Sequence, residues 1–418
     1  MNTREEGRTV SLTDRMSRWI LPAGVDSAAR LLLASRGLRG FCDGFIAVLL
    51  PAYLLALGFG QLDVGLIGTT TLIGSAVATI AVGALANRFA ARRMFIFAAA
   101  LMIATGVGFG GLSSLLPILI VAFVGTLNPS SGDVSLFLPL EQSRLAEMAA
   151  GDARTALFAR YSLIGAVSAA VGSLAAGLPA WLVAHTGIAE LLAMRAMFLL
   201  YAVTGVVIWL LYRRLPRSGT QAHVHTAPLD QSRGIVTRLA LLFSVDAFAG
   251  GLVVNTLLTL WLMQRFGLPV GAAGQFFFWA ELLTALSQLA APPLARKIGL
   301  LNTMVFTHIP ASLCLIAAAF TASLPVTLVL LLVRSALSQM DVPTRTAYVM
   351  AVVTPSERPA AASFTSVPRS LAASLGPSLA GGLIGFGWLG APLIACGALK
   401  IAYDLSLLFL FRHVKPDD

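Results

Sequence analysis

Charged residues are scarce in this chain of 418 residues: Asp, Glu, Lys and Arg make up 11% of it, whereas soluble domains carry about 25%. Hydrophobic residues make up 57%, and the mean hydropathy is +0.84. A surface that water solvates cannot be built from so few polar side chains. The apolar runs are about 17 to 25 residues long, which is enough for a helix to cross a hydrocarbon core of about 30 Å. This composition predicts an integral membrane protein.

Cysteine and nucleotide-binding motifs are also scarce, which excludes several kinds of site. Cys42, Cys314 and Cys396 lie inside apolar runs, where they predict neither a disulfide framework nor a thiolate metal site. No lysine follows a glycine, so the chain has no P-loop and a self-contained ATP-driven pump is excluded. No H-E-x-x-H zinc motif occurs. We expect no cofactor, no metal and no enzyme activity.

Twelve membrane-spanning helices can be placed on the apolar runs. A polar segment with Pro, Gly and Ser, Arg213–Arg238, has the composition of a linker and separates six spans from six. The predicted fold is therefore all-α, with two pseudo-symmetric six-helix bundles. The expected divisions are an N-terminal segment 1–35, a first bundle 36–212, a linker 213–239, a second bundle 240–411 and a tail 412–418. The expected spans are 36–58, 62–86, 94–112, 115–139, 157–183, 192–212, 240–263, 270–293, 303–320, 325–351, 361–384 and 388–411.

A basic segment occurs twice, half a chain apart. LANRFAARR begins at Leu85, and LARKIGLLN begins at Leu294, 209 positions later; each follows a long apolar run. A period of half the chain indicates two equivalent bundles rather than a short-repeat solenoid. Asp43-Gly44-Phe45 in the first span likewise matches Asp246-Ala247-Phe248 in the seventh.

The residues around the first basic segment resemble a known signature. GALANRFAARR, from Gly83 to Arg93, resembles the motif G-x-L-a-D-r-x-G-r-[RK]-[RK] between helices 2 and 3 of the major facilitator superfamily. Asn87 stands where an aspartate is usual and Ala90 where a glycine is usual, which leaves hydrogen bonding but no negative charge at the aspartate position. The resemblance implies an alternating-access secondary transporter whose site lies between two bundles at the bilayer midplane. The signature residues are Gly83, Asn87, Arg88, Arg92 and Arg93.

Basic residues gather on one side of this topology. The side of the termini and the linker carries most of the arginines and lysines, whereas the other side keeps Arg195 and Arg265. By the positive-inside rule, both termini and the linker are expected in the cytoplasm, and the protein in the inner membrane. The net charge of +10 is then a topogenic signal, and no nucleic-acid partner is expected. The expected partners are the lipid bilayer, a small-molecule substrate and a proton as coupling ion, and the expected state is a monomer.

Acids and bases recur inside the spans at a repeated spacing. Arg160 follows Asp133 by 27 positions, and Arg369 follows Asp341 by 28. A charge in the membrane interior costs at least about 2.5–3.5 kcal/mol, so it is normally paired or faces water. We interpret such residues as cytoplasmic gate charges that separate as the bundles rock; static pairing between helices is the alternative. The gate set is Asp43, Asp133, Arg160, Asp246, Arg345 and Arg369. Nearer the cytoplasmic ends, five residues are expected to reach into water: Arg36, Arg39, Glu141, Arg144 and Arg154.

Glu281 and Arg334 are the most deeply placed charges in the predicted spans. A partly desolvated carboxyl group takes up a proton more readily, so Glu281 is a candidate proton carrier. A 4, 3, 4 spacing places four polar residues of the tenth span on one helix face, and this span lines the central cavity in the family. These are Arg334, Ser338, Asp341 and Arg345. The residues predicted to bind substrate or couple protons are Glu281, Arg334, Ser338 and Asp341; the alternative is a structural Arg334–Glu281 pair.

A second resemblance bears on the direction of transport. LGPSLAGG, from Leu375 to Gly382, resembles the G-P-x-x-G-G signature of the superfamily's antiporters, which lies in their helix 5, whereas here it lies in helix 11. Proton-coupled export of a small organic or amphipathic compound is the first hypothesis. Uptake or exchange of a small anion is the second, because of Arg334 and Arg369. A non-transporting receptor or scaffold is the third.

Overall fold

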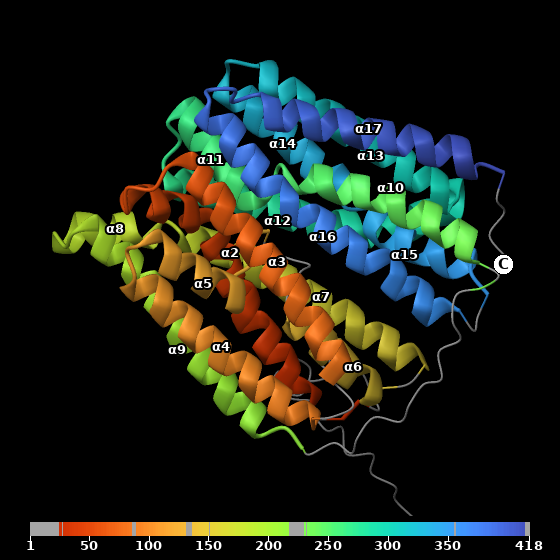
Figure 1. Cartoon of the computed structure of the whole chain (residues 1–418), viewed down its shortest axis with the longest axis horizontal. Helices are drawn as coiled ribbons and strands as arrows, with labels where there is room; N and C mark the ends of the chain where they lie inside the picture. Colours follow the sequence, from red (N-terminus) through yellow and green to blue (C-terminus); the bar gives the residue numbers. More distant parts are fainter. Residues whose placement is uncertain are drawn as a thin grey trace, which may run out of the picture.

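The computed structural model describes residues 25–26, 28–85, 89–130, 136–149, 151–216, 230, 232–354 and 357–413. In this part of the chain every regular element is an α-helix (Figure 1). The first half forms α2 (Ala29–Ala56), α3 (Gln61–Leu85), α4 (Ala91–Gly111), α5 (Leu115–Val124), α6 (Phe137–Glu147), α7 (Gly151–Ala175), α8 (Leu178–Thr186) and α9 (Glu190–Arg213). The second half forms α10 (Arg233–Gly251), α11 (Asn255–Phe266), α12 (Val270–Ile298), α13 (Leu300–Phe320), α14 (Leu324–Ser338), α15 (Asp341–Ala351), α16 (Arg358–Gly385) and α17 (Ala391–Phe411).

The predicted all-α membrane fold is confirmed. Nine stretches of the described residues are helical, long and apolar enough to cross a membrane. The α5–α6 pair, α12 and α16 complete the twelve spans. α5 is apolar but only 10 residues long, whereas ionisable residues and prolines interrupt α12 and α16, such as Glu281 in α12 and Pro368 in α16. Two helices begin earlier than the expected 36 and 157, at Ala29 and Gly151, because their first turns carry charged residues that an apolar run leaves out.

Spans 4 and 7 are interrupted, so the prediction of single helices over 115–139 and 240–263 was wrong. Span 4 leaves the helix at Gly125, which has an extended backbone, and Pro129 supplies no N–H for a helical bond. Span 7 breaks between α10 and α11, after two glycines that weaken the helix end. Broken helices expose backbone groups that are tolerated only where protein or a cavity receives them.

Span 10 is also interrupted, between α14 and α15, where one helix over 325–351 was expected. Pro343 lies in the first turn of α15 and lacks the N–H that would bond to the carbonyl of Gln339. Its ring also crowds that carbonyl, so the helix is disrupted at Gln339 and Met340. Arg334 and Ser338 therefore belong to one helix and Asp341 and Arg345 to the next, which corrects the expected continuous polar face.

The helices of each half pack closely through small residues. In Figure 1 the first-half helices, red to yellow-green, lie below the second-half helices, green to blue. A Cβ atom on Gly44 of α2 would lie 2.0 Å from the carbonyl oxygen of Ala169 in α7, so only glycine permits this approach. Gly251 of α10 meets Gly376 of α16 in the same way, with a built Cβ 3.2 Å from the facing Cα atom.

Among the described residues, hydrogen bonds and close glycine contacts join the two bundles toward the end opposite the linker. Gly65 of α3 packs on Pro377 and Gly381 of α16, and Gly274 of α12 packs on the backbone of Ser173 in α7. Three hydrogen bonds between described residues cross the interface: Ser378 N donates to Thr69 Oγ1 (3.0 Å), and both N and Oγ1 of Thr256 donate to the carbonyl of Pro129 (3.2 and 3.0 Å). The bundles are therefore joined at this far end.

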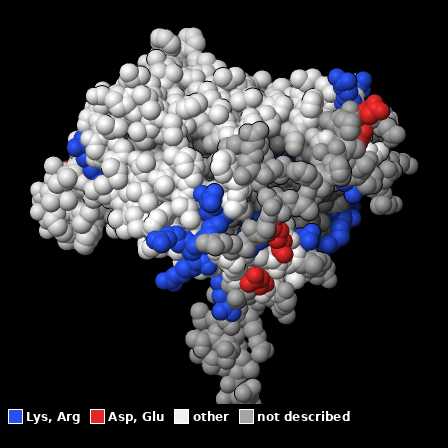
Figure 2. Space-filling view, turned by 60° about the horizontal axis from the view of Figure 1, so that its bottom comes forward, with Lys and Arg blue, Asp and Glu red and all other residues white. Residues whose placement is uncertain are grey.

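The outer surface separates into apolar and basic regions. Large hydrophobic side chains are exposed along the helices, for example Phe97 (63%), Leu116 (70%) and Phe409 (71%), as expected for residues facing lipid. Figure 2 turns the lower side of Figure 1 toward the reader. Lys and Arg side chains gather on this side, and few charges are visible elsewhere. Described basic residues at helix ends beside the linker are exposed: Arg93, Arg214, Arg238, Arg296, Lys297, Arg358 and Arg412.

Candidate functional site

Two basic side chains of the second bundle converge on the carboxylate of Asp246 in α10. Arg345 Nη1 of α15 lies 3.0 Å from Asp246 Oδ2, and Lys400 Nζ of α17 lies 2.6 Å from Oδ1. Asp246 and Arg345 are buried. Breaking either pair would leave a buried charge without its partner, which is costly inside a membrane span.

His308 of α13 extends this cluster to a further acid. Its Nδ1 lies 3.1 Å from Asp404 of α17, and its Nε2 lies 3.3 Å from Lys400 Nζ and 3.9 Å from Asp246 Oδ1. On the other side of Asp246, Arg345 Nη1 lies 3.2 Å from Asp341 Oδ2. We call these six residues the second-bundle network: Asp404, His308, Lys400, Asp246, Arg345 and Asp341.

This network contains three residues that the sequence selected and three that it missed. Asp246, Asp341 and Arg345 were predicted as membrane-embedded charges and are brought together here. His308, Lys400 and Asp404 were not predicted. Lys400 and Asp404 stand four residues apart in an apolar run, which is a signal that could have selected them.

The first bundle buries a different cluster, centred on Glu141 of α6. The Arg39 guanidinium of α2 pairs with Glu141 Oε2, and the hydroxyls of Tyr161 and Tyr212 donate to Oε2 and Oε1, each at 2.6 Å. Arg39 also lies over the ring of Phe137, 4.4 Å from its centroid. Arg39 is 3% exposed and Glu141 0%. The expectation that these two reach into water was wrong, because two tyrosines from other helices cover them.

The other predicted gate residues are placed less uniformly. Asp43 is buried in α2 and makes no hydrogen bond or ion pair with another described residue, although Arg39 lies close enough to act on it electrostatically. Arg160 is partly buried in α7. Arg369 of α16 acts electrostatically on Asp246. Asp133 lies outside the described residues. Whether these charges form a gate stays a prediction.

Glu281 lies at the junction of the two bundles. Its Oε1 accepts a hydrogen bond from Asn255 Nδ2 at 2.8 Å, and Asn255 is the first residue of α11, directly after the break in span 7. The next residue, Thr256, holds Pro129 in the break of span 4. Two broken spans and one acid thus meet at a single place, an arrangement that favours a site between bundles.

Arg334 does not pair with Glu281 among the described residues. It is partly buried in α14, and no hydrogen bond or ion pair joins it to another described residue. Ser338, four positions on, is the last residue of α14. A cation inside a membrane protein needs a counter-charge or water, so Arg334 is suited to an anionic group of a ligand.

The loop signature is described only in part. Gly83 lies in α3, whereas Asn87 and Arg88 lie outside the described residues. Arg92 donates from Nη2 to the carbonyl of Arg213, so the start of α4 is tied to the end of α9. Arg93 is exposed.

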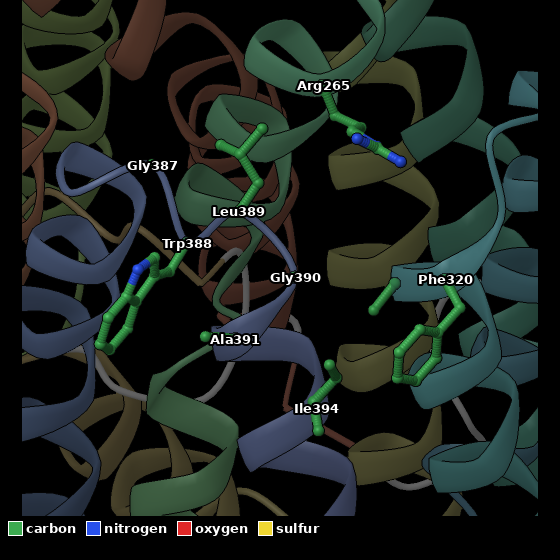
Figure 3. Close-up of a pocket in the computed structure, with 9 residues that line it drawn as sticks. Arg265, Phe320, Gly387, Trp388, Leu389, Gly390, Ala391 and Ile394 are labelled. Atoms are coloured by element: carbon green, nitrogen blue, oxygen red, sulfur yellow. The ribbon is translucent and has the colours of Figure 1, made fainter.

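A surface pocket of about 390 Å³ lies at the far end of the second bundle (Figure 3). Its walls are aromatic and small residues with one cation, Arg265, at its edge in Figure 3. None of the predicted site residues and neither of the two buried clusters lines it, so it is not the candidate transport site. The lining residues are Arg265, Ala319, Phe320, Gly387, Trp388, Leu389, Gly390, Ala391 and Ile394.

The chain is similar to known transporters over nearly its whole length. It matches the sequence profile of the Major Facilitator Superfamily over residues 32–338 and 239–418. An uncharacterized membrane protein of Saccharomyces cerevisiae is 24% identical, over 92% of this chain and 94% of that protein. The structure is similar to that of the nucleoside transporter NupG, with a TM-score of 0.72, 14% identity and coverage of 93% of this chain and 100% of that chain. A D-xylose-proton symporter gives a TM-score of 0.71, 18% identity and coverage of 93% and 98%. The chain therefore belongs to the Major Facilitator Superfamily and is a membrane transporter, not an enzyme.

Proposed function

We propose that this secondary transporter couples the export of a small organic or amphipathic compound to proton entry, with Glu281 as the proton carrier. The observation that carries the proposal is the hydrogen bond from Asn255 to Glu281, one residue away from the Thr256–Pro129 contact that joins the bundles. Alternating access requires this contact to break when the bundles rock the other way. A titrating group beside it can therefore link proton binding to rocking.

Protonation changes what Glu281 can hold. An ionised carboxylate only accepts hydrogen bonds, and a charge-assisted bond is about twice as strong as a neutral one. Proton uptake would therefore weaken the bond from Asn255 Nδ2 and loosen the start of α11. The Thr256–Pro129 contact follows directly in the chain, so we infer that it loosens as well.

The direction of transport rests on the G-P-x-x-G-G resemblance in α16. In this segment Gly376 packs on α10 of its own bundle, whereas Gly381 packs on Gly65 of the first bundle. The same short stretch thus contacts both bundles, which suits a pivot. The mostly apolar helices suit an organic or amphipathic cargo better than an inorganic one.

Uptake or exchange of a small anionic metabolite is the second candidate. Arg334 favours it, since this partly buried cation has no acidic partner among the described residues. A bound carboxylate or phosphate would supply the missing negative charge. Under this candidate, Arg334→Gln abolishes all transport, including exchange, whereas under proton-coupled export it leaves exchange measurable.

We further propose that both termini and the linker face the cytoplasm, that the protein resides in the inner membrane and that it acts as a monomer. The one-sided distribution of exposed basic residues supports the orientation (Figure 2). Cysteines introduced at Ser113 and at Ser218, which lies outside the described residues, should react from opposite faces in a background without Cys42, Cys314 and Cys396. An impermeant maleimide should reach Ser218 only from the cytoplasmic side. Reaction of both from one side would contradict the topology.

The coupling role is tested in proteoliposomes after a substrate has been identified with a panel of metabolites and drugs, with and without an imposed pH gradient. Glu281→Gln keeps the side-chain shape but removes the titrating group. Gradient-driven transport should fail, while exchange of substrate for substrate survives. Glu190→Gln, an equivalent change at the exposed start of α9, is the control and should keep both activities. A Glu281→Gln protein that still concentrates substrate against its gradient would end the proposal.

A further inference from the structure

His308 is a buried histidine whose two ring nitrogens face groups of different kind. It is 2% exposed and lies in α13, on the side that packs against α17. Nδ1 faces the carboxylate of Asp404 at 3.1 Å, and Nε2 faces the ammonium group of Lys400 at 3.3 Å. Asp404 is 0% exposed and hydrogen-bonds to no group except His308 among the described residues.

These partners are satisfied together by one form of the imidazole ring. A neutral ring with its proton on Nδ1 donates to Asp404, and its Nε2 lone pair accepts from Lys400. The ammonium group then has hydrogen atoms left for Asp246, which it contacts at 2.6 Å. Every polar contact of the ring has a donor and an acceptor in this form, so the geometry corresponds to a neutral His308.

A proton added at Nε2 cannot be accommodated without a rearrangement. It would place an N–H against the Lys400 ammonium, donor against donor and charge against charge. The acceptor within reach is Asp246 Oδ1, 3.9 Å from Nε2, and Lys400 occupies that oxygen. Lysine has a flexible stem and Lys400 is 13% exposed, so it is the group that can move away.

Charged groups from three neighbouring helices surround His308. α10 contributes Asp246; α17 contributes Lys400 and Asp404, with Tyr403 at a ring distance of 6.2 Å; α15 contributes Asp341 and Arg345. Arg369 of α16 acts on Asp246 from farther away. α12 and α14, which also pack on α13, place no described ionisable group within ion-pair distance of His308. Within ion-pair contact, three carboxylates face two permanent cations, and one proton balances them.

We propose that His308, with Asp404, is a proton-binding site inside the second bundle, separate from Glu281, and that its protonation transfers Asp246 from Lys400 to His308. Asp246 also holds Arg345 of α15, so the exchange acts on the linker-side half of span 10. This site goes beyond the proposed coupling through Glu281 and binds its proton whether or not that coupling holds.

The site can be tested by nitrogen NMR without any substrate. The chain has five histidines, and changing His185, His223, His225 and His413 to Gln leaves His308 as the one labelled histidine. Spectra are recorded between about pH 8 and 5, the range in which histidines are commonly titrated. We expect the Nδ1–H form at the alkaline end and a doubly protonated ring after acidification. Asp404→Asn should remove the preference for the Nδ1–H form, since the acceptor charge is lost, whereas Glu190→Gln should not. A ring that stays neutral over this range, or carries its proton on Nε2, would overturn the proposal.

The movement of Lys400 is read in the same samples. Lys297→Arg and Lys415→Arg leave Lys400 as the one lysine, so its labelled Nζ reports whether it stays on Asp246. Its signal should shift together with the His308 step, and the shift should disappear in Asp404→Asn. A His308 step with no change at Lys400 would contradict the transfer.

The effect on span 10 is read by spin-label distances between cysteines at the exposed Gln142 of α6 and Thr346 of α15. The distance is measured at several pH values in the Glu281→Gln background, which lacks the proposed proton carrier. A pH-dependent change in this distance should persist in that background and be lost in His308→Asn. If His308→Asn does not fold, Asp404→Asn replaces it. Loss of the change in Glu281→Gln alone would show that Glu281, and not His308, drives it.

Discussion

Each bundle buries one cluster of charged residues, and the two clusters are built differently. In the first bundle, Glu141 is surrounded by Arg39 and the hydroxyls of Tyr161 and Tyr212. In the second, Asp246 is shared by Arg345 and Lys400, with His308 next to it. Arginine stays charged and tyrosine neutral over the physiological pH range, whereas histidine changes charge within it. The first cluster is therefore suited to holding helices together and the second to responding to protons.

The repeated acids show how the duplicated halves have diverged. Asp43 and Asp246 occupy matching positions in the sequence repeat. Asp246 has two cations within 3.0 Å, whereas Asp43 has no hydrogen bond or ion pair with another described residue. In the first bundle, the arginine one turn before Asp43, Arg39, is taken by Glu141 instead. Equivalent position thus does not give equivalent chemistry; the partner groups decide it.

The largest expected effect comes from breaking the first-bundle cluster. Arg39→Met leaves Glu141 as an uncompensated buried charge, and removing one partner of a buried pair costs about 3–5 kcal/mol. The free energy of unfolding in detergent or bicelles measures it. Arg144→Met is the control, because the Arg144–Glu147 pair is more exposed and worth about 0–1 kcal/mol. The double change Arg39→Met with Glu141→Met should recover much of the loss; no recovery would show that packing, and not charge, is what Arg39 supplies.

A smaller effect should separate the two repeated acids. Asp246→Asn removes the charge that binds Arg345 and Lys400, and hydrogen bonds to charged groups are worth about 1.5–3 kcal/mol. Arg345 keeps Asp341, and Lys400 keeps its contact with His308 Nε2 and is 13% exposed, so the loss should stay within that range. Asp43→Asn should leave the free energy of unfolding unchanged or raise it, because an acid without a bound partner gains from neutralisation. Equal losses in both variants would mean that Asp43 has a partner as strong as those of Asp246.

Part of the second-bundle network could be predicted from the sequence. The pairs around Arg345 join residues that their depth and spacing had already selected, and Asp341–Arg345 is an ordinary i, i+4 pair on one helix. His308 could not be found in this way. It is a single histidine in an apolar run, and its partners Lys400 and Asp404 lie 92 and 96 positions away.

The burial of Glu141 was also out of reach of the sequence. Glu141 lies close to the end of a predicted span, which suggested contact with water. The tyrosine hydroxyls that cover it belong to residues 20 and 71 positions away in the sequence. The overall fold was predictable because apolar length and basic turns are local signals. The breaks in spans 4, 7 and 10 were harder to predict. Residues such as Gly125 and Pro343 weaken a helix, but tertiary contacts decide whether the helix continues through them.

The smallest expected effect tests whether the acid-to-base spacing of 27 and 28 positions has one role in both halves. In this structure Asp341 pairs with Arg345, and we predict that it exchanges to Arg369 in the state closed to the cytoplasm. Asp341→Asn and Arg369→Gln should then each increase the labelling rate of a cysteine at Ser338 by an impermeant reagent from the cytoplasmic side, in the cysteine-free background. The double change should be less than additive, with a coupling of at least about 0.5 kcal/mol. The matched pair in the first half, Asp133→Asn with Arg160→Gln, is the comparison. Coupling in both halves would identify a duplicated gate. Coupling in the second half alone would show that the gate, like the two clusters, differs between the halves. Strictly additive effects on the labelling free energy in the second half would show that Asp341 and Arg369 are not partners.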